Sequence, residues 1–230
     1  MLYFANASSP TVRAAMAAGE IGMMCTPAEG RSPAGARVWA ADNGCYGQGY
    51  PGDVRWLKWL AKLQPYAGNC RFAVAPDVFD SVNMAGDAGA TLAMSVPLLP
   101  EIEKLGYRPA FAAQDGTEDH PVPWDRFAVL FLAGSTSWKL GEPAAALAAE
   151  ALHRGKTVHM GRVNSRKRWL IAERLGCASA DGTFLAYGPD TNLQRMRRWS
   201  VTTADTPPAG STPAVRTRRC TGAQTPGRQA

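Results

Sequence analysis

The chain has 230 residues, 46% of them hydrophobic and 19% charged, and a net charge of +6 at pH 7. This composition excludes an intrinsically disordered chain and is typical of a globular protein with a sizeable core. No apolar run approaches the roughly 20 residues that span a bilayer, and the N-terminus lacks the regions of a signal peptide. The five cysteines are scattered and form no C-x-x-C pair, which favours reduced thiols and a cytoplasmic location.

In chain order, short apolar segments alternate with amphipathic ones. Several apolar segments are continuous, which is typical of strands buried on both faces of a parallel sheet. We expect eight strands, at residues 2–5, 21–25, 37–41, 70–75, 109–113, 127–133, 157–160 and 177–180. We expect helices at residues 54–63, 88–105, 143–154 and 165–175. This alternation predicts a compact (β/α)8 barrel of the TIM type, in the α/β class, with a doubly wound open sheet as the structural alternative.

From about Thr202 the sequence changes to Thr, Pro, Ala, Gly and Arg, with almost no bulky apolar residue. Such a segment cannot bury enough surface to offset its ordering entropy. We therefore predict a barrel domain over residues 1–200 and a disordered basic tail over residues 201–230. The tail holds four arginines against Asp205, so it contributes +3 of the net +6. A basic body with a basic tail suits a nucleic-acid partner, although ordinary solubility charge explains it about equally well.

Polar residues or glycine follow several of the expected strands. The positions of interest are Asp42, Asn43, Asp77, Gln114, Gly134 and Asp181. A turn or a helix cap explains each of them taken alone. The carboxyl ends of barrel strands, however, converge on the one face where active sites lie, so we expect these residues to form a cluster. Such a cluster offers a nucleophile, a proton-transfer group and hydrogen-bonding partners for a flat heterocycle.

A basic run follows the seventh expected strand and contains Arg162, Arg166, Lys167 and Arg168. Asn164 or Ser165 could cap the next helix and leave free N–H groups near these cations, which predicts a phosphate site. The alternative is a solvated basic helix start. Two of the three histidines are too isolated to act as a metal set, so we expect core or surface roles for the histidines and no metal.

An ordered series of motifs resembles the tRNA-guanine transglycosylase (queuine tRNA-ribosyltransferase) superfamily. The series is Ala41-Asp42-Asn43-Gly44, Pro76-Asp77, Ala113-Gln114-Asp115-Gly116, Leu132-Ala133-Gly134 and Ala180-Asp181. Its character is closest to the DNA-acting branch, the DpdA-like proteins that insert 7-deazaguanines into DNA. The resemblance spans residues 2–190 approximately and implies a glycosyltransferase that exchanges guanine in DNA for a 7-deazaguanine base.

The resemblance also implies a role for each matched residue. Asp181 matches the family's nucleophilic aspartate, which attacks the sugar C1′. Asp42 matches the aspartate linked to base positioning and proton transfer.

Four further positions match the family's contacts with the base. Asp77 and Gln114 match residues that hydrogen-bond the purine-like ring. Gly134 matches a backbone contact to that ring, and Asn43 stands where a small polar residue is usual.

The chain departs from the family in one respect. The tRNA enzymes carry a C-terminal zinc site of three cysteines and one histidine, whereas here the only cysteine beyond Cys177 is Cys220. We therefore expect no zinc subdomain and no cofactor, and we favour DNA over tRNA as the substrate. The remaining alternatives are an N-glycosidic hydrolase, a tRNA-acting transglycosylase and a non-catalytic nucleic-acid-binding protein. The sequence leaves monomer and homodimer both open.

Overall fold

The computed structural model describes residues 1–46, 49–80 and 85–204, and it confirms the predicted barrel. Eight parallel strands close on themselves in the order β1-β10-β9-β8-β7-β4-β3-β2, so the open-sheet alternative is wrong. The strands are β1 (Leu2–Ala5), β2 (Gly22–Cys25), β3 (Trp39–Ala41), β4 (Cys70–Val74), β7 (Pro109–Ala113), β8 (Val129–Leu132), β9 (Thr157–Met160) and β10 (Ser179–Asp181). The first and last strands pair with each other, and Phe4 lies opposite Asp181.

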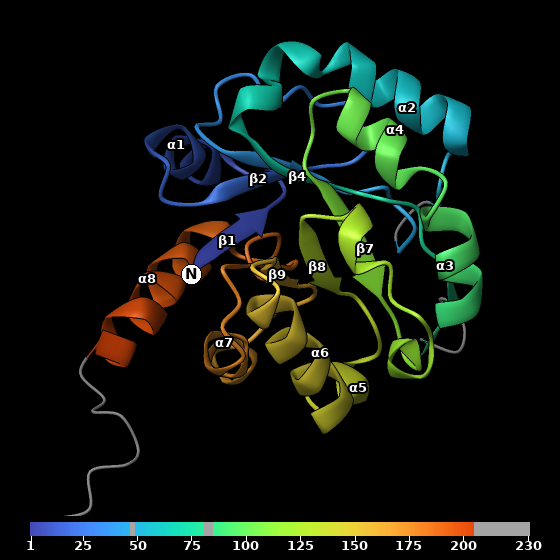
Figure 1. The fold of residues 1–230 in the computed structure, drawn as a ribbon. Helices are drawn as coiled ribbons and strands as arrows, with labels where there is room; N and C mark the ends of the chain where they lie inside the picture. Colours follow the sequence, from blue (N-terminus) through green and yellow to red (C-terminus); the bar gives the residue numbers. More distant parts are fainter. Residues whose placement is uncertain (47–48, 81–84, 205–230) are drawn as a thin grey trace, which may run out of the picture.

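Helices surround the barrel, as Figure 1 shows. They are α1 (Pro10–Ala18), α2 (Asp53–Lys62), α3 (Ala88–Ser95), α4 (Leu99–Lys104), α5 (Thr136–Lys139), α6 (Glu142–His153), α7 (Arg166–Arg174) and α8 (Pro189–Ala204). Residues 26–38, between β2 and β3, are all described and contain no helix. The β7–β8 connection has only the 3-10 turns Thr117–Asp119 and Trp124–Arg126. A 3-10 segment, Gln64–Asn69, leads into β4. The missing helices explain how a barrel fits into about 200 residues, the lower limit for this fold.

Two predicted boundaries are wrong. The expected helix over residues 88–105 is divided into α3 and α4, because proline at position 97 has no N–H and disfavours helical geometry in the residue before it. The folded unit extends past residue 200, because α8 continues to Ala204. The Trp199 ring of α8 packs 4.6 Å from the ring of Phe184, which adds an apolar anchor for this helix. The predicted tail beyond Ala204 lies outside the described residues.

The core has two layers. The outer layer lies between strands and helices and includes the fully buried indoles of Trp39, Trp56 and Trp169. The inner layer fills the barrel with alternate residues of the strands: Phe4, Met24, Val38, Ala40, Phe72, Val74, Ala110, Ala112, Val129 and Phe131. The barrel is therefore a packed core, and a ligand can enter only at its ends.

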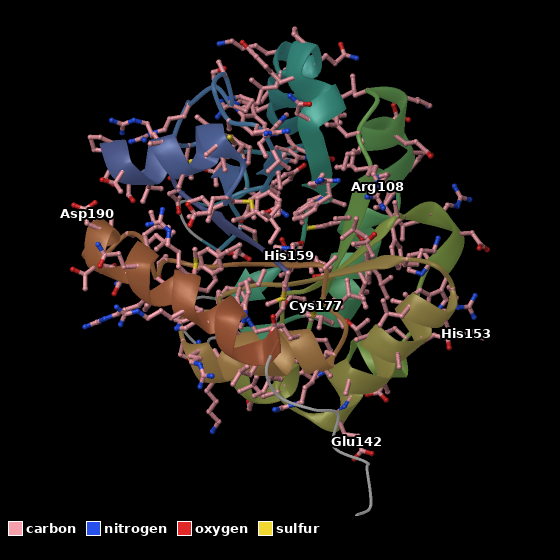
Figure 2. The ribbon with its side chains drawn as sticks, turned by 90° about the vertical axis from the view of Figure 1, so that its left-hand side faces the viewer. Arg108, Glu142, His153, His159, Cys177 and Asp190 are labelled. Carbon is pink, nitrogen blue, oxygen red and sulfur yellow. The ribbon has the colours of Figure 1, made fainter. Side chains whose placement is uncertain are left out.

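One polar ring stands inside this apolar layer. His159 of β9 is fully buried and lies at the centre of the barrel in Figure 2, whereas His153 lies at the periphery on α6. The imidazole centroid lies 4.6 Å from the ring centroid of Phe131, 4.8 Å from that of Phe72 and 6.0 Å from that of Phe4. The three phenyl rings fix its position just below one mouth of the barrel.

A short antiparallel hairpin, β5 (Phe79–Asp80) and β6 (Ala85–Gly86), follows β4 and precedes α3. It stands outside the barrel sheet and carries Phe79 towards the mouth. Among the described residues, no helix has the length and apolar character needed to cross a membrane.

We predict that Gly22→Ala destabilises the fold by about 1–3 kcal/mol, the usual cost of overpacking a core. A Cβ at this position in β2 would overlap the ring of Phe4, with even Cγ of that ring only 3.1 Å away. The matched control is Gly68→Ala, where an added Cβ meets nothing within 4 Å. Urea denaturation followed by circular dichroism measures both, and equal midpoints for the two variants would contradict the packing argument.

Candidate active site

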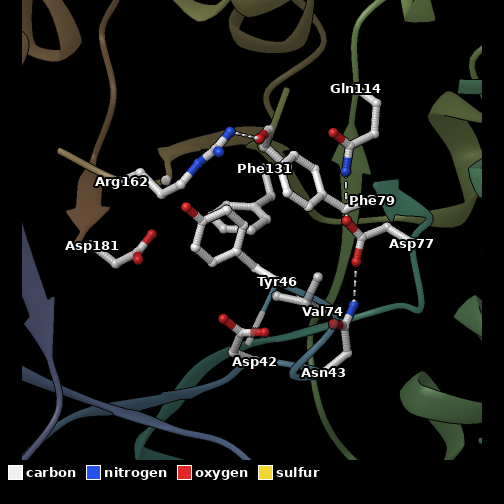
Figure 3. Close-up of a pocket in the computed structure, with 12 residues that line it drawn as sticks. Asp42, Asn43, Tyr46, Val74, Asp77, Phe79, Gln114, Phe131, Arg162 and Asp181 are labelled. Atoms are coloured by element: carbon white, nitrogen blue, oxygen red, sulfur yellow. Dashed lines mark hydrogen bonds between the residues drawn. The ribbon is translucent and has the colours of Figure 1, made fainter. Parts of the chain in front are cut away.

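The carboxyl ends of the strands surround a cavity with an inner and an outer part. The inner part has an empty volume of about 470 Å³ and the outer part about 1300 Å³, both including space open to solvent. Asp42, Tyr46, Arg162 and Asp181 line both parts. Figure 3 shows Asp42 and Asp181 on one side of the inner part, with Asp77 and Gln114 on the other. The structure thus brings together six of the predicted site residues, since Asn43 and Arg162 also line the inner part.

Asp77 forms the centre of a hydrogen-bonded edge on the far side of the inner cavity. Its Oδ1 accepts from Asn43 Nδ2 at 2.7 Å, and its Oδ2 accepts from Gln114 Nε2 at 2.5 Å. Burial raises the pKa of the Asp77 carboxyl, while these two donors oppose the rise. These two hydrogen bonds fix the orientation of the carboxyl group, and each oxygen retains a further lone pair for a ligand.

Asn43 supports this edge from behind. Its amide nitrogen also donates to the Ala75 carbonyl at 2.8 Å, and its amide oxygen accepts from the Cys45 N–H at 2.8 Å. Both of its N–H donors are thus used within the protein. Asn43 therefore acts on Asp77, and direct contact with a base would require it to give up one of these bonds.

Gln114 lines the inner cavity and has one unused acceptor, which lies against Gly86. The residue is fully buried, and its Oε1 has no hydrogen-bond partner in the protein. A buried unpaired carbonyl costs about 1–3 kcal/mol, so such an atom indicates a ligand or a water molecule at this point. Gly86 makes the arrangement possible, because a Cβ there would lie 2.6 Å from the Cβ of Gln114. The amide orientation follows from the network, since its nitrogen must donate to a carboxylate.

Asp181 ends β10 and stands at the boundary between the two parts of the cavity. Its Oδ1 lies 3.0 Å from Nε2 of His159, and the other imidazole nitrogen lies 2.8 Å from the hydroxyl of Ser179. The side chain of Asp181 is 18% exposed, whereas that of His159 is completely buried. Gly182 is required here for space, because a Cβ would lie 2.7 Å from the Tyr3 hydroxyl and still closer to the side-chain oxygen of Asn164.

Asp42 follows β3 and differs electrostatically from Asp181. Burial is the largest cause that raises its pKa, and the negative charges of Asp181 and Asp77 add to the rise. The N–H of Gly44 donates to its Oδ1 at 2.8 Å and opposes the shift. The pKa of Asp42 is about 7, so this carboxyl group can both donate and accept a proton near neutral pH.

Arg162 covers the inner cavity together with two aromatic rings. Its guanidinium lies 4.8 Å from the ring centroid of Tyr46 and 5.1 Å from that of Phe79, and it donates to the Ala133 carbonyl at 2.6 Å. Its backbone has a φ of +59°, a left-handed conformation that is uncommon in residues other than glycine. Such strain is concentrated at functional sites.

Gly134 contributes differently from the expectation. Its N–H donates to the Ala113 carbonyl at 3.1 Å, and its carbonyl accepts from Arg162, so both backbone groups have partners in the protein. The neighbouring Ala133 lines the inner cavity instead. An added Cβ at Gly134 would lie 2.5 Å from the Trp138 ring, so packing requires glycine here.

The predicted phosphate site is only partly assembled. Arg162 and Arg168 line the outer cavity, and Nη1 of Arg168 donates to the Arg162 carbonyl at 3.1 Å. Arg166 and Lys167 are exposed and line neither part. Ser165 caps α7 by accepting from the N–H of Arg168 at 3.3 Å. The two cations at the mouth therefore stand beside a capped helix start.

Four residues that line or support the cavity were missed by the sequence analysis: Tyr46, Phe79, Lys139 and His159. Lys139 is buried and donates to the Gly161 carbonyl at 2.6 Å; burial, together with the charge of Arg162, lowers its pKa to about 7. It lines neither cavity. The only sequence signal for His159 was the alternation of Ser179 and Asp181 on the next strand, and the register that pairs His159 with Ser179 is known from the fold.

No protein-family model and no curated protein matches the chain. Solved structures do match it. A native KDPGal structure has a TM-score of 0.50 and 12% identity, covering 87% of this chain and 96% of its own. A cube-shaped porous cage, designed by fusing symmetric oligomeric domains, has a TM-score of 0.49 and 14% identity, covering 88% and 77% respectively. At 12% identity, the likeness to the native KDPGal structure shows the fold alone. The family suggested by the strand-end motifs stays a prediction.

The described part of the chain contains no group of three or more His, Cys, Asp or Glu residues arranged to hold a metal ion.

We predict that the carboxyl group of Asp42 titrates near pH 7, well above its ordinary value of 3.8. Asp181→Asn should lower this pKa, because it removes a neighbouring negative charge, yet leave it above 3.8 because burial persists. The measurement is the 13C carboxyl shift of labelled aspartate across pH. Glu101→Gln on the exposed side of α4 is the control and should change nothing. An Asp42 that titrates near pH 4 in the wild type would refute the assignment.

Proposed function

We propose that this protein is a base-exchange transglycosylase that replaces guanine in DNA with a 7-deazaguanine base. The observation that carries the proposal is that the two sides of one cavity present groups suited to different tasks. A fixed hydrogen-bonding edge, Asp77 with Gln114, faces two carboxyl groups in different environments: burial raises the pKa of Asp42 to about 7, whereas Asp181 is partly exposed and contacts His159. Such pairs of unlike carboxyl groups are typical of acid–base and nucleophilic catalysis at a glycosidic centre.

Asp181 is the proposed nucleophile. One of its oxygens attacks C1′ of the deoxyribose, the C1′–N9 bond to guanine breaks, and a glycosyl ester forms with Asp181. Cleavage of such a bond builds positive charge on the sugar, which a carboxylate on the opposite face stabilises. The incoming base then attacks C1′ from the side that guanine left, and Asp181 leaves as a carboxylate. Two inversions retain the configuration of the sugar.

Asp42 is the proposed proton-transfer group. In the first half-reaction it donates its proton to the departing guanine, and in the second it takes the ring N–H proton of the incoming 7-deazaguanine. A group that acts in both directions is most effective when its pKa lies near the working pH. The pKa of about 7 satisfies this condition.

The Asp77–Gln114 edge is the proposed reader of the base. Guanine and the 7-deazaguanines present two neighbouring N–H donors on one edge, at the ring nitrogen and at the exocyclic amine. The unpaired Oε1 of Gln114 and the remaining lone pairs of Asp77 are acceptors that suit these donors. Tyr46 and Phe79 add flat apolar surfaces against which a heterocycle can stack.

Base exchange is favoured over hydrolysis because three side chains cover the inner cavity. Arg162, Tyr46 and Phe79 stand over the inner part, and their contacts would limit the access of water to a glycosyl ester. An N-glycosidic hydrolase would use the same carboxyl groups, and it is the principal alternative. A lysine nucleophile is a further route to covalent catalysis, but Lys139 lines neither cavity and is engaged with Gly161.

The nucleic acid is proposed to enter through the outer cavity. Arg162 and Arg168 are available near the mouth to contact phosphate, and the target nucleotide would have to leave the base stack to reach Asp181. We favour DNA over tRNA because the ordered strand-end motifs are closest in character to the DNA-acting branch of the family that they resemble. A non-catalytic binding role is less favoured, because carboxylates at the mouth repel phosphate.

We predict that Asp181→Asn folds and binds DNA but neither exchanges guanine nor forms a covalent adduct. The amide keeps the shape of the side chain, yet it cannot form a glycosyl ester. The assay incubates DNA that carries radiolabelled guanine with the protein and 7-deazaguanine bases, followed by nucleoside mass spectrometry. Asp190→Asn, on the exposed start of α8, is the control and should keep full activity. Guanine loss without incorporation of a new base would instead indicate the hydrolase.

We predict that Gln114→Ala raises KM for the incoming base with a smaller effect on kcat. Loss of a paired acceptor in a buried site costs about 1–3 kcal/mol, which corresponds to a factor of about 5 to 150. Gln64→Ala is the control, because Gln64 is exposed and donates only to the Leu105 carbonyl at 3.2 Å. Steady-state kinetics with the base as the varied substrate makes the measurement, and an unchanged KM would remove Gln114 from the base site.

A further inference from the structure

We propose that His159, held by Ser179, is a positioning residue that fixes Asp181 and leaves one carboxylate oxygen free for attack. This inference rests on the proposed function and deepens it, because it assigns the group that orients the nucleophile. It starts from two contacts inside the barrel: His159 Nε2 to Asp181 Oδ1 at 3.0 Å, and His159 Nδ1 to Ser179 Oγ at 2.8 Å.

The ring cannot move without disturbing the core. It is completely buried between the phenyl rings of Phe4, Phe72 and Phe131, which all belong to the inner layer of the barrel. Neighbouring strands carry the three polar residues, since β9 pairs with β10 and His159 lies opposite Ser179. A side chain held this firmly sets the position of whatever it binds.

The partners decide which nitrogen carries the proton. An ionised carboxylate only accepts, so Nε2 must be protonated and donate to Oδ1 of Asp181. In the neutral ring Nδ1 is then an acceptor, and the hydroxyl of Ser179 must donate to it. Burial lowers the pKa of His159, and the charge of Lys139 does the same, while the hydrogen bond with Asp181 opposes the shift. Ser179 therefore selects the tautomer that Asp181 needs.

The order of the hydrogen-bonded residues Ser179, His159 and Asp181 distinguishes this arrangement from a serine-nucleophile triad. In such a triad the serine faces the substrate and the carboxylate is the buried end. Here Asp181 lines the active-site cavity and Ser179 does not. Ser179 is 7% exposed and lines another cavity with Phe72 and Arg108, neither of which lines either part of the active-site cavity. In this hydrogen-bonded series the reacting residue is therefore Asp181.

The arrangement serves both half-reactions. With Oδ1 engaged by the imidazole, Oδ2 is the oxygen that is free to bond to C1′. When the glycosyl ester breaks, the N–H of His159 stabilises the carboxylate that returns. Gly161 leaves room for this geometry, because a Cβ there would lie 3.3 Å from Oδ1 of Asp181 and 3.1 Å from the Phe131 ring.

The test compares two replacements of one side chain. His159→Phe keeps an aromatic ring in the core but removes the donor to Asp181, and it should lower kcat about 100-fold, the loss expected when a reacting group is misplaced by about 1 Å. His159→Gln retains an N–H donor and should recover much of that loss. KM for the incoming base should change little in either variant, because Asp77 and Gln114 are untouched. His153→Phe on the exposed side of α6 is the control.

A second measurement reads the tautomer directly. The 15N spectrum of the wild type should show His159 neutral with its proton on Nε2, and Ser179→Ala should reduce this preference and lower kcat about tenfold. A proton on Nδ1, or equal kcat for His159→Phe and the wild type, would overturn the proposal. So would labelling of Ser179 by a serine-directed fluorophosphonate probe.

The two proposals fail in different ways. A wild-type protein that exchanges no base overturns the proposed function, yet the 15N spectrum still decides whether His159 donates to Asp181. An active wild type whose His159→Phe variant keeps full kcat overturns the positioning role alone.

Discussion

Closure of the barrel is the constraint on which the candidate site depends. The first strand pairs with the last, so Leu2 lies opposite Ser179 and Phe4 opposite Asp181. This pairing places β10, which ends at Asp181, beside β1, which begins at Leu2. Because all eight strands are parallel, their carboxyl ends meet at one mouth, and loops that are distant in sequence supply its walls. An open sheet with the same strands would leave Asp42 and Asp181 apart.

The three aspartates at this mouth are alike in sequence and different in environment. Asp77 has two amide donors, Asp181 has one imidazole donor, and Asp42 has one backbone N–H. Burial without full compensation, next to two like charges, brings the pKa of Asp42 to about 7. Unlike environments for like groups are how an active site obtains both an acid and a nucleophile.

Glycine makes this density of polar groups possible. Gly86 allows Gln114 to approach, Gly161 allows the carboxylate of Asp181 to approach, and Gly182 makes room for Tyr3 and Asn164. None of the three has a positive φ, so the requirement is for space and not for backbone freedom. The opposite case is Arg162, a large residue in the left-handed region that stands over the cavity. The glycines that are required for space and the left-handed Arg162 thus lie at the same mouth of the barrel.

The sequence alone predicted the eight strands of the barrel sheet and the polar residues that follow them, and it left an open sheet as the alternative to a barrel. Continuous apolar segments such as residues 109–113, bounded by polar residues and glycine, are typical of buried parallel strands, whose carboxyl ends lie on one side. Tertiary structure decided the rest. The sequence indicates no more than a core or surface role for His159, and the β9–β10 register is what places it beside Asp181. The sequence indicates no role for Phe79, which the β5–β6 pair carries to the mouth. Asn43 lines the inner cavity and Gly134 does not, and only the folded chain shows that the hydrogen-bonding groups of both already have partners. The physical reason is that local pattern fixes which face a residue takes, whereas contacts between distant strands fix what it touches.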